Sequence, residues 1–192
     1  VKGQLPDLPL HLSTQATIYN LEGIKVAERL GASRVILARE LSLKEIRDIA
    51  NGIRAASVAN GTKAISVEKG TRVELEMFIH GALCQCYSGQ CHLSSMIGGR
   101  SGNRGICAQP CRLPYTITRE AGEIHKAVSK KGYYLSPKDL CTVEHLDKLI
   151  ASGIRSLKIE GRMKSAEYVA IVTGIYRKYL DLYFEDPDHY RV

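Results

Sequence analysis

In the stretch RVELEMFIH, residues 72–80, every second side chain is apolar. One set of positions is apolar and holds Val73, Leu75, Met77 and Ile79. The other set holds Glu74, Glu76, Phe78 and His80. A period of two predicts a β-strand that buries one face. A cysteine-rich stretch follows this strand directly, so the strand leads into the part of the sequence that is richest in reactive groups.

Strand-like and helix-like patterns alternate on both sides of this stretch. The predicted strands span residues 8–15, 33–40, 72–80 and 155–162. The predicted helices span residues 20–32, 42–53, 142–154 and 165–186. Ser42 and Glu45 form a capping box for the second helix, and Thr142 is the predicted cap of the third. Alternation of this kind is typical of α/β proteins with a parallel sheet.

Four βα units are half of the eight units in a barrel. The predicted fold class is therefore α/β, with a partial (β/α) TIM-barrel-like fold and a C-terminal helix. Residues 1–192 are expected to form a single domain, the C-terminal part of such a barrel. A Cys-rich insertion over residues 81–141 would contain a polar hairpin at residues 114–137. A fragment of a larger barrel, or half-barrels that self-associate, would account for the small number of units.

The predicted strands end in polar residues. These ends are Ser13-Thr14-Gln15, Arg39-Glu40, His80 and Glu160-Gly161-Arg162. In (β/α) barrels the chemistry lies at the carboxyl ends of the strands. Some of these residues would cap helices or pair with each other, but four polar ends together favour a shared pocket.

The composition is that of an ordinary globular protein, with 44% hydrophobic and 24% charged residues. The sequence has no apolar run of transmembrane length and no signal-peptide pattern at its start, so a cytoplasmic protein without membrane contact is expected. The formal net charge of +7 is consistent with a polyanionic partner such as RNA, although many basic proteins bind no nucleic acid.

Five of the six cysteines lie within FIHGALCQCYSGQCHLSSMIGGRSGNRGICAQPCR, residues 78–112. The full set is Cys84, Cys86, Cys91, Cys107, Cys111 and Cys141. Their spacing lacks the C-x2-C knuckles of zinc modules, and cytoplasmic thiols stay reduced, so metal or cluster binding is favoured. The nearby Arg100, Arg104 and Arg112 could balance the negative charge of a cluster. The alternatives are structural zinc, disulfides, plain buried thiols, or a catalytic cysteine activated by a histidine such as His80 or His92.

Several blocks of the sequence resemble the collagenase-like peptidase family U32. They are ELEMFIHGALCQCYSGQCHLSS, NRGICAQPCRLPY, SPKDL and SLKIEGRMKS, and the resemblance covers essentially the whole chain. Full-length members carry more βα units before the first strand. Some members were described as collagen-degrading proteases, whereas better-understood relatives take part in prephenate-dependent hydroxylation of a tRNA wobble uridine or a 23S rRNA cytidine. The stretch IGGRSGNRGICAQPCRLPY is most similar to the ribosomal-RNA group.

The resemblance implies a 4Fe–4S cluster as cofactor. Carried over by position, the ligands would be Cys84, Cys91, Cys107 and Cys111. Some relatives take the fourth ligand from a downstream cysteine, so Cys141 is the alternative, while the short loop from Cys107 favours Cys111. Cys86 is expected to be a bystander.

The same hypothesis assigns roles to the polar strand ends. Arg39 and Arg162 would bind the two carboxylates of prephenate, the predicted co-substrate. His80 and Glu160 are the candidate proton-transfer groups. The candidate RNA contacts are Lys126, Lys130, Lys131, Lys158, Arg162 and Lys164. A solvated polar face is the plain alternative for these basic residues.

A peptidase and a non-catalytic iron–sulfur module are the competing functions. The sequence contains neither the zinc-protease motif H-E-x-x-H nor the hydrolase motif G-x-S-x-G. A cysteine protease could use Cys84 or Cys91 with His80, yet nothing in the sequence marks one thiol as reactive.

Overall fold

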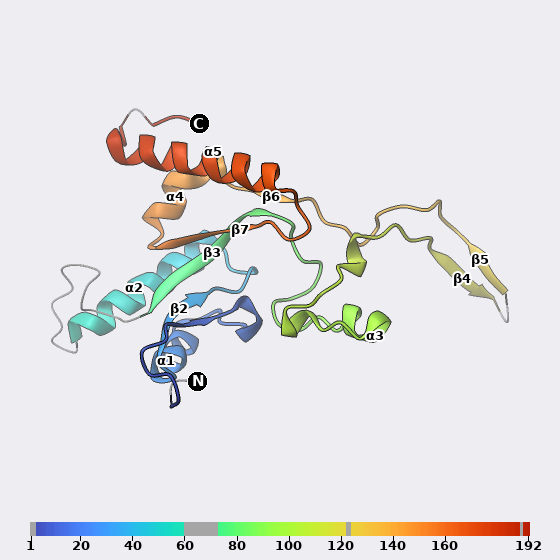
Figure 1. Cartoon of the computed structure of the whole chain (residues 1–192), viewed down its shortest axis with the longest axis horizontal. Helices are drawn as coiled ribbons and strands as arrows, with labels where there is room; N and C mark the ends of the chain where they lie inside the picture. The colour runs from blue at the N-terminus through green and yellow to red at the C-terminus, as the bar shows by residue number, and fades with distance from the viewer. Residues whose placement is uncertain (1–2, 60–72, 122–123, 189) are drawn as a thin grey trace. The chain divides into compact units, whose positions relative to one another are not determined.

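The computed structural model describes residues 3–59, 73–121, 124–188 and 190–192. The chain divides into two compact units, whose elements are labelled in Figure 1. The sheet unit comprises Val1–Ala82 and Asp139–Val192, and the cysteine unit comprises Leu83–Lys138. The cysteine unit lies within the span of residues 81–141 that the sequence predicts for the insertion.

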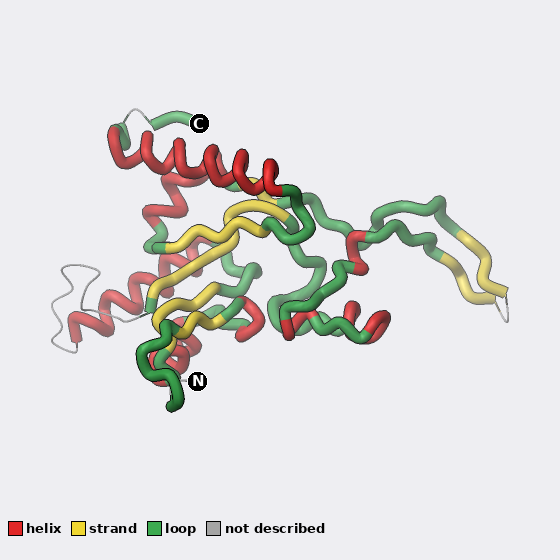
Figure 2. Tube along the Cα trace, viewed as in Figure 1, coloured by secondary structure: helices red, strands yellow, loops and turns green. Residues whose placement is uncertain are grey.

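The sheet unit is built on five strands. They are β1 (Leu10–Leu12), β2 (Ala32–Ile36), β3 (Glu74–Gly81), β6 (Leu140–Cys141) and β7 (Ser156–Glu160). β1, β2, β3 and β7 are parallel neighbours in that order, and Figure 2 shows them side by side. β6 pairs antiparallel with His80 and Gly81 at the end of β3. The predicted α/β class is confirmed. The prediction of a wholly parallel sheet is wrong at β6, because a strand of two residues is too short to show a periodic pattern in the sequence.

The described part of the sheet unit contains the α-helices α1 (Leu21–Arg29), α2 (Leu43–Ala59), α4 (Leu146–Ala151) and α5 (Ala166–Glu185). The capping box of α2 is confirmed, since the Ser42 amide donates to Glu45 Oε2 at 2.8 Å and the Glu45 amide to Ser42 Oγ at 3.3 Å. Thr142 occupies the N-cap position of the 3-10 turn Val143–His145 that leads into α4, as predicted. Its side chain makes no capping hydrogen bond, because the hydroxyl donates to the carbonyl of Ile79 at 2.8 Å. Within the described residues, no helix is both long and apolar enough to cross a membrane.

Two apolar clusters hold the helices against one face of the sheet. The first joins α1, α2, β2 and β3, and its buried members include Ile24, Ala27, Val35, Leu37, Ile46, Ile49, Val73 and Leu75. The second joins Ile79 of β3 to α4 and α5 through Leu146, Leu149, Val172 and Tyr176. Met77 and Leu157 pack against both clusters. The alternation predicted for residues 72–80 therefore buries Val73, Leu75 and Ile79 as expected.

Gly81 allows β3 and β7 to approach closely at their carboxyl ends. Its φ is +102°, and a Cβ built there would lie 2.1 Å from the carbonyl oxygen of Glu160. Only glycine tolerates both conditions. The β3–β7 register also shifts between Phe78 and His80, as at a β-bulge. Strict alternation, which would place His80 on the same face as Glu76, ends at this shift.

The cysteine unit consists mostly of loops. It contains α3 (Leu93–Gly98), short 3-10 turns at Gly102–Arg104 and Pro110–Arg112, and a hairpin of β4 (Thr118–Ala121) and β5 (Ile124–Ala127). The predicted polar hairpin is confirmed by the pairing of Thr118 with Ala127, while its tip at residues 122–123 is outside the described residues. The buried residues in the described part of the unit are Ser88, Ser94 and Pro110. The described residues of this unit therefore form no apolar core like the one that supports the sheet unit.

Candidate functional site

His80 lies at the end of β3 against two tyrosine rings of α5. Its ring centroid is 6.0 Å from that of Tyr168 and 5.6 Å from that of Tyr176. Burial lowers the pKa of His80, while the charge of Asp139 raises this pKa and that of Lys164 lowers it, each to a smaller extent. The imidazole is therefore neutral near pH 7, which is the form that can accept a proton.

Tyr176 connects His80 to the backbone around it. Its hydroxyl donates to the Ile79 carbonyl at 3.0 Å and accepts from the Thr142 amide at 3.1 Å. The same hydroxyl is 3.4 Å from Nδ1 of His80. Because the single hydroxyl proton is directed to Ile79, we assign the proton of neutral His80 to Nδ1. Nε2 then carries the free lone pair, and no described residue hydrogen-bonds to it.

An ion pair lies beside this histidine. Lys164 Nζ is 3.1 Å from Asp139 Oδ2 and 4.8 Å from the ring centroid of Tyr168. The sequence did not indicate Asp139, Lys164, Tyr168 or Tyr176 as neighbours of His80. The tyrosines belong to the helical pattern of α5, and no local motif connects that helix to the end of β3. The one available signal was that tyrosines at apolar positions of a helix are expected to be buried, and a buried tyrosine hydroxyl usually needs a hydrogen-bond partner.

Glu160, Arg162 and Arg39 also lie near the carboxyl ends of the parallel strands. Glu160 is the register partner of Gly81, next to His80, and its Oε1 accepts from the Arg162 amide at 2.7 Å. Arg39 follows β2 and Arg162 follows β7, so β3 lies between the two strands that they follow. Both arginines are half-buried, and both already interact within the chain. The structure thus places His80 on β3 and Glu160 on the neighbouring strand β7. Arg39 follows β2 on one side of β3, and Arg162 follows β7 on the other.

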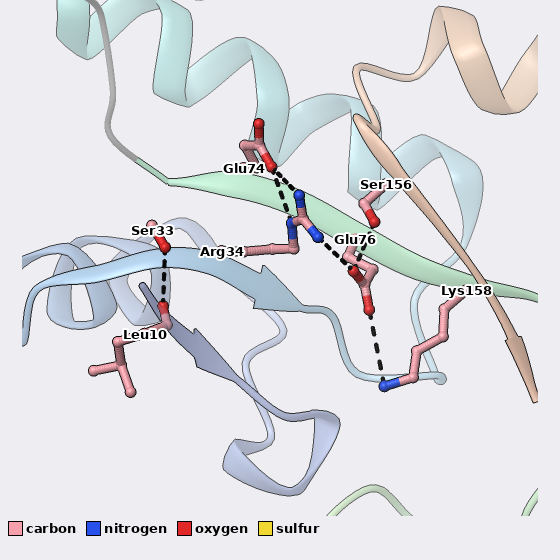
Figure 3. Close-up of polar contacts among 7 residues, drawn as sticks. All are labelled: Leu10, Ser33, Arg34, Glu74, Glu76, Ser156 and Lys158. Carbon is pink, nitrogen blue, oxygen red and sulfur yellow. Dashed lines mark hydrogen bonds and ion pairs between the residues drawn. The ribbon is translucent and has the colours of Figure 1, made fainter. Parts of the chain in front are cut away.

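A polar ladder crosses β2, β3 and β7 on the sheet face opposite the apolar clusters (Figure 3). Arg34 Nε donates to Glu74 Oε2 at 2.9 Å, and Arg34 Nη1 is 3.5 Å from Glu76 Oε2. Ser156 donates to Glu76 Oε2 at 2.6 Å, and Lys158 Nζ is 3.8 Å from Glu76 Oε1. Glu76 is only 8% exposed, so these three donors compensate a buried carboxylate. Sequence parity predicted that Glu74 and Glu76 share a face, but their partners depend on register between strands.

The cysteine unit contains five cysteines, and none of them forms a disulfide: Cys84, Cys86, Cys91, Cys107 and Cys111. Burial raises the pKa of Cys111, and the charges of Cys84 and Cys107 raise it further. Burial also raises the pKa of Cys86, with added contributions from Cys91 and Cys84. The charge of Cys84 thus raises the pKa of both Cys86 and Cys111.

The donor chemistry of this set suits an iron–sulfur cluster, which is held by thiolates. Across the part of the chain that the structure describes, no three His, Cys, Asp or Glu side chains converge closely enough to hold a metal ion. Cys141 belongs to β6 in the sheet unit, where it is exposed and is the register partner of His80. The two candidates for the fourth ligand, Cys111 and Cys141, therefore lie in different units.

Arg112 holds the beginning and the end of the cysteine unit together. Its guanidinium donates to the carbonyl of Leu83 at 2.8 Å, to that of Pro137 at 2.7 Å and to Ser136 Oγ at 3.0 Å. Arg100 Nε donates to the carbonyl of Ile106 at 3.0 Å. Two of the three arginines that were predicted to balance cluster charge thus also hold loop backbone in place.

Known proteins are similar to this chain over nearly its whole length. The chain is 40% identical over 190 residues to a tRNA hydroxylation protein of Bacillus subtilis, covering 96% of this chain and 40% of that protein. It is 41% identical over 182 residues to the 23S rRNA 5-hydroxycytidine synthase of Escherichia coli, covering 95% and 25%. It is 38% identical over 174 residues to a collagenase of Porphyromonas gingivalis, covering 91% and 40%.

The chain thus spans between a quarter and two fifths of the length of these three relatives. No solved structure matches it. The family model for peptidase family U32 matches residues 1–191. Since this match leaves out only the last residue, the chain belongs to peptidase family U32.

Proposed function

We propose that this chain is part of an iron–sulfur RNA hydroxylase that acts on a tRNA wobble uridine or a 23S rRNA cytidine, with prephenate as co-substrate. The observation that carries the proposal is 40–41% identity to two proteins named for RNA hydroxylation, over 95–96% of the chain. A function on these RNAs places the protein in the cytoplasm.

The small apolar burial among the described residues of the cysteine unit supports a bound cluster. A unit of this size gains limited stability from apolar burial, and small proteins often add disulfides, a metal centre or oligomerisation. None of the unit's cysteines forms a disulfide. A cluster held by Cys84, Cys91 and Cys107, with Cys111 or Cys141 as the fourth ligand, would cross-link the loops. When bound, it would supply a redox centre or a Lewis acid.

The sheet unit would supply substrate binding and proton transfer. His80 is neutral and has a free lone pair on Nε2, so it can accept a proton from a substrate group. Glu160, on the neighbouring strand, is the second proton-transfer candidate. Arg39 and Arg162 would bind the two carboxylates of prephenate, because guanidinium groups match carboxylate geometry.

We also propose that β1, β2, β3 and β7 are part of a (β/α) TIM-barrel-like sheet. Their parallel order, with a helix between successive strands, is the arrangement that such a barrel repeats. The remaining units would come from the rest of a longer protein or from a second copy of the chain. Light scattering on the purified chain tests the second source, since a monomer at micromolar concentration would exclude self-association there.

Nucleoside mass spectrometry tests the function directly. Deleting the gene should remove one hydroxylated pyrimidine from tRNA or 23S rRNA, and the wild-type gene should restore it. His80→Gln should restore little, whereas His145→Gln, at an exposed histidine of the same unit, should restore it fully. An unchanged nucleoside profile in the deletion strain would reject RNA hydroxylation.

Anaerobic purification with iron and sulfide analysis tests the cluster. Cys84→Ser, Cys91→Ser and Cys107→Ser should each lose bound iron, whereas Cys86→Ser should retain it as the matched control. Comparison of Cys111→Ser with Cys141→Ser then identifies the fourth ligand. Wild-type protein without iron under these conditions would contradict the proposal.

A collagenase-like peptidase is the second candidate, favoured by the 38% identity to the Porphyromonas collagenase. It predicts gelatin cleavage by the purified chain. Loss of cleavage in Cys84→Ala or Cys91→Ala would implicate these thiols in that activity. Absence of cleavage by wild-type protein, with a normal hydroxylation readout, would exclude it in favour of the RNA hydroxylase.

A further inference from the structure

The positive charge of the chain is concentrated in the cysteine unit. The whole chain has 27 Lys and Arg against 20 Asp and Glu, which gives +7. The segment Leu83–Lys138 holds eight of these basic residues and two of the acidic ones, which gives +6. The sheet unit keeps the other 19 and 18, which gives only +1. An attraction for polyanions therefore comes mainly from the smaller unit.

The basic residues predicted near the last strand are largely neutralised. Lys158 lies 3.8 Å from Glu76 and Lys164 lies 3.1 Å from Asp139. Arg119, Lys130 and Lys131 of the cysteine unit are exposed instead, and they form no ion pair with any residue that the structure describes. These hairpin cations remain available to phosphate groups.

The hairpin holds the two lysines on a bulge. Thr118 pairs with Ala127, and Tyr115 pairs with Gly132. The chain advances three residues from Tyr115 to Thr118 but five residues from Ala127 to Gly132. The second segment therefore has two extra residues, which must protrude as a bulge. The bulge is held by a bond from the Ile117 amide to Ser129 Oγ at 2.9 Å. Because Lys130 and Lys131 lie in this segment, the backbone that carries them is positioned before any ligand binds.

Two exposed aromatic residues follow the bulge. Tyr133 is 65% exposed and Tyr134 is 50% exposed. The Tyr134 hydroxyl donates to the Lys130 carbonyl at 2.7 Å, which ties this ring to the bulge. No side-chain hydrogen bond to a described residue holds Tyr133. Cations beside exposed aromatic rings are the combination on which single-stranded nucleic acids bind, through phosphate contacts and base stacking.

We propose that Arg119, Lys130, Lys131, Tyr133 and Tyr134, the basic hairpin patch, bind single-stranded RNA. The inference rests on the proposed RNA function and names the surface through which the chain holds its substrate. The lysines and the arginine contact phosphates, and the tyrosines stack on unpaired bases. The patch lies wholly within the cysteine unit, so no residue of the sheet unit is needed to form it.

The test measures the affinity of the purified chain for a fluorescent single-stranded RNA of mixed sequence at several salt concentrations. The variant Arg119→Gln/Lys130→Gln/Lys131→Gln should weaken binding at least tenfold at low salt. The slope of log K against log salt concentration is negative, and each lost phosphate contact reduces its magnitude by about 0.7. The magnitude of the slope should therefore be smaller by about 2 in this variant.

A matched control removes the same charge from the sheet unit. Lys25→Gln/Lys44→Gln/Arg177→Gln replaces three surface cations that are ion-paired with Glu22, Asp48 and Asp181. This control should change affinity less than twofold. Equal losses in both triple variants would show that net charge alone attracts RNA, and this would overturn the proposal. Unchanged binding in the hairpin variant would also overturn it, and would leave the patch as a surface for a protein partner.

Tyr133 separates stacking from charge. Tyr133→Ala should weaken binding about five- to tenfold with an unchanged salt slope, and Tyr133→Phe should bind like wild type. If Tyr133→Ala also binds like wild type, stacking at this ring is rejected. The result is independent of the nucleoside assay: normal hydroxylation with an unimpaired hairpin variant would reject the patch alone. Failure of the proposed RNA hydroxylation would instead appear as an unchanged nucleoside profile in the deletion strain.

Discussion

The sheet unit buries two clusters of large apolar side chains, whereas the described part of the cysteine unit buries two serines and a proline. The sheet unit pairs its charges internally, as in the ladder around Glu76, and carries a net charge of only +1. The cysteine unit leaves its hairpin cations exposed and relies on hydrogen bonds such as those of Arg112. Apolar burial is therefore concentrated in the first unit, and the cysteines and the exposed hairpin cations Arg119, Lys130 and Lys131 in the second.

This difference follows from how each unit can be stabilised. Apolar burial contributes in proportion to area, and the sheet unit has enough area to fold on it. The described residues of the cysteine unit bury little apolar area, and under the proposed function a bound cluster would supply the cross-links between its loops. The same type of substitution should therefore lower the free energy of unfolding by different amounts in the two units.

The largest expected effect is at Gly81. Gly81→Ala should destabilise the protein by about 4 kcal/mol or more, because the new Cβ meets the Glu160 carbonyl and the backbone has a positive φ. The matched change Gly99→Ala in the cysteine unit, at φ +68° with no atom within 4 Å, should cost only about 1 kcal/mol. Urea unfolding measures both. Equal costs would mean that the β3–β7 contact is dispensable.

Removal of a core side chain should come next. Leu149 is 2% exposed in the second apolar cluster, and Leu149→Ala should cost about 2–5 kcal/mol through lost burial and the cavity left behind. Met96 of the cysteine unit is 82% exposed, and Met96→Ala should change stability by about 0.5 kcal/mol or less. The same unfolding assay applies. A large cost at Met96 would show that its side chain is buried in solution.

The polar ladder should give an intermediate effect. Glu76→Ala removes the acceptor shared by Arg34, Ser156 and Lys158, and should cost about 3 kcal/mol because it leaves these donors without their partner. Glu74→Ala, at a carboxylate whose side chain is 42% exposed, should cost about 1 kcal/mol or less. Thermal unfolding of the two variants compares them. A Glu74 effect as large as that of Glu76 would contradict the assigned burial.

The smallest effect is expected at the capping box of α2. Ser42→Ala should lower the melting temperature by about 1–4 °C. Hydrogen bonds from Ser42 lower the pKa of Glu45 below its usual 4.5, so this stabilisation is present above that pH and is lost as the pH falls through the lowered value. The difference between wild type and Ser42→Ala should therefore shrink in acid. A difference that persists in acid would show that the Glu45 carboxylate does not contribute.

Much of the fold could be predicted from local patterns. The alternation of residues 72–80, the capping box at Ser42 and the hairpin after the cysteines each depend on neighbours only a few positions apart. The antiparallel strand β6 and the bond from Thr142 to Ile79 could not be predicted in this way. The Thr142–Ile79 bond joins residues 63 positions apart, and a two-residue strand carries no periodicity.

The sequence by itself determined the α/β alternation, the thiol-rich segment and the family, because periodicity, residue spacing and motif content are properties of the chain order. Tertiary structure alone decided which charges are paired and which are exposed. Glu76 meets Ser156 across 80 positions and His80 meets Tyr176 across 96, and register and helix packing select these partners. The same packing neutralises Lys158 and Lys164 and leaves Lys130 and Lys131 exposed, since only folding brings acidic groups next to the first pair.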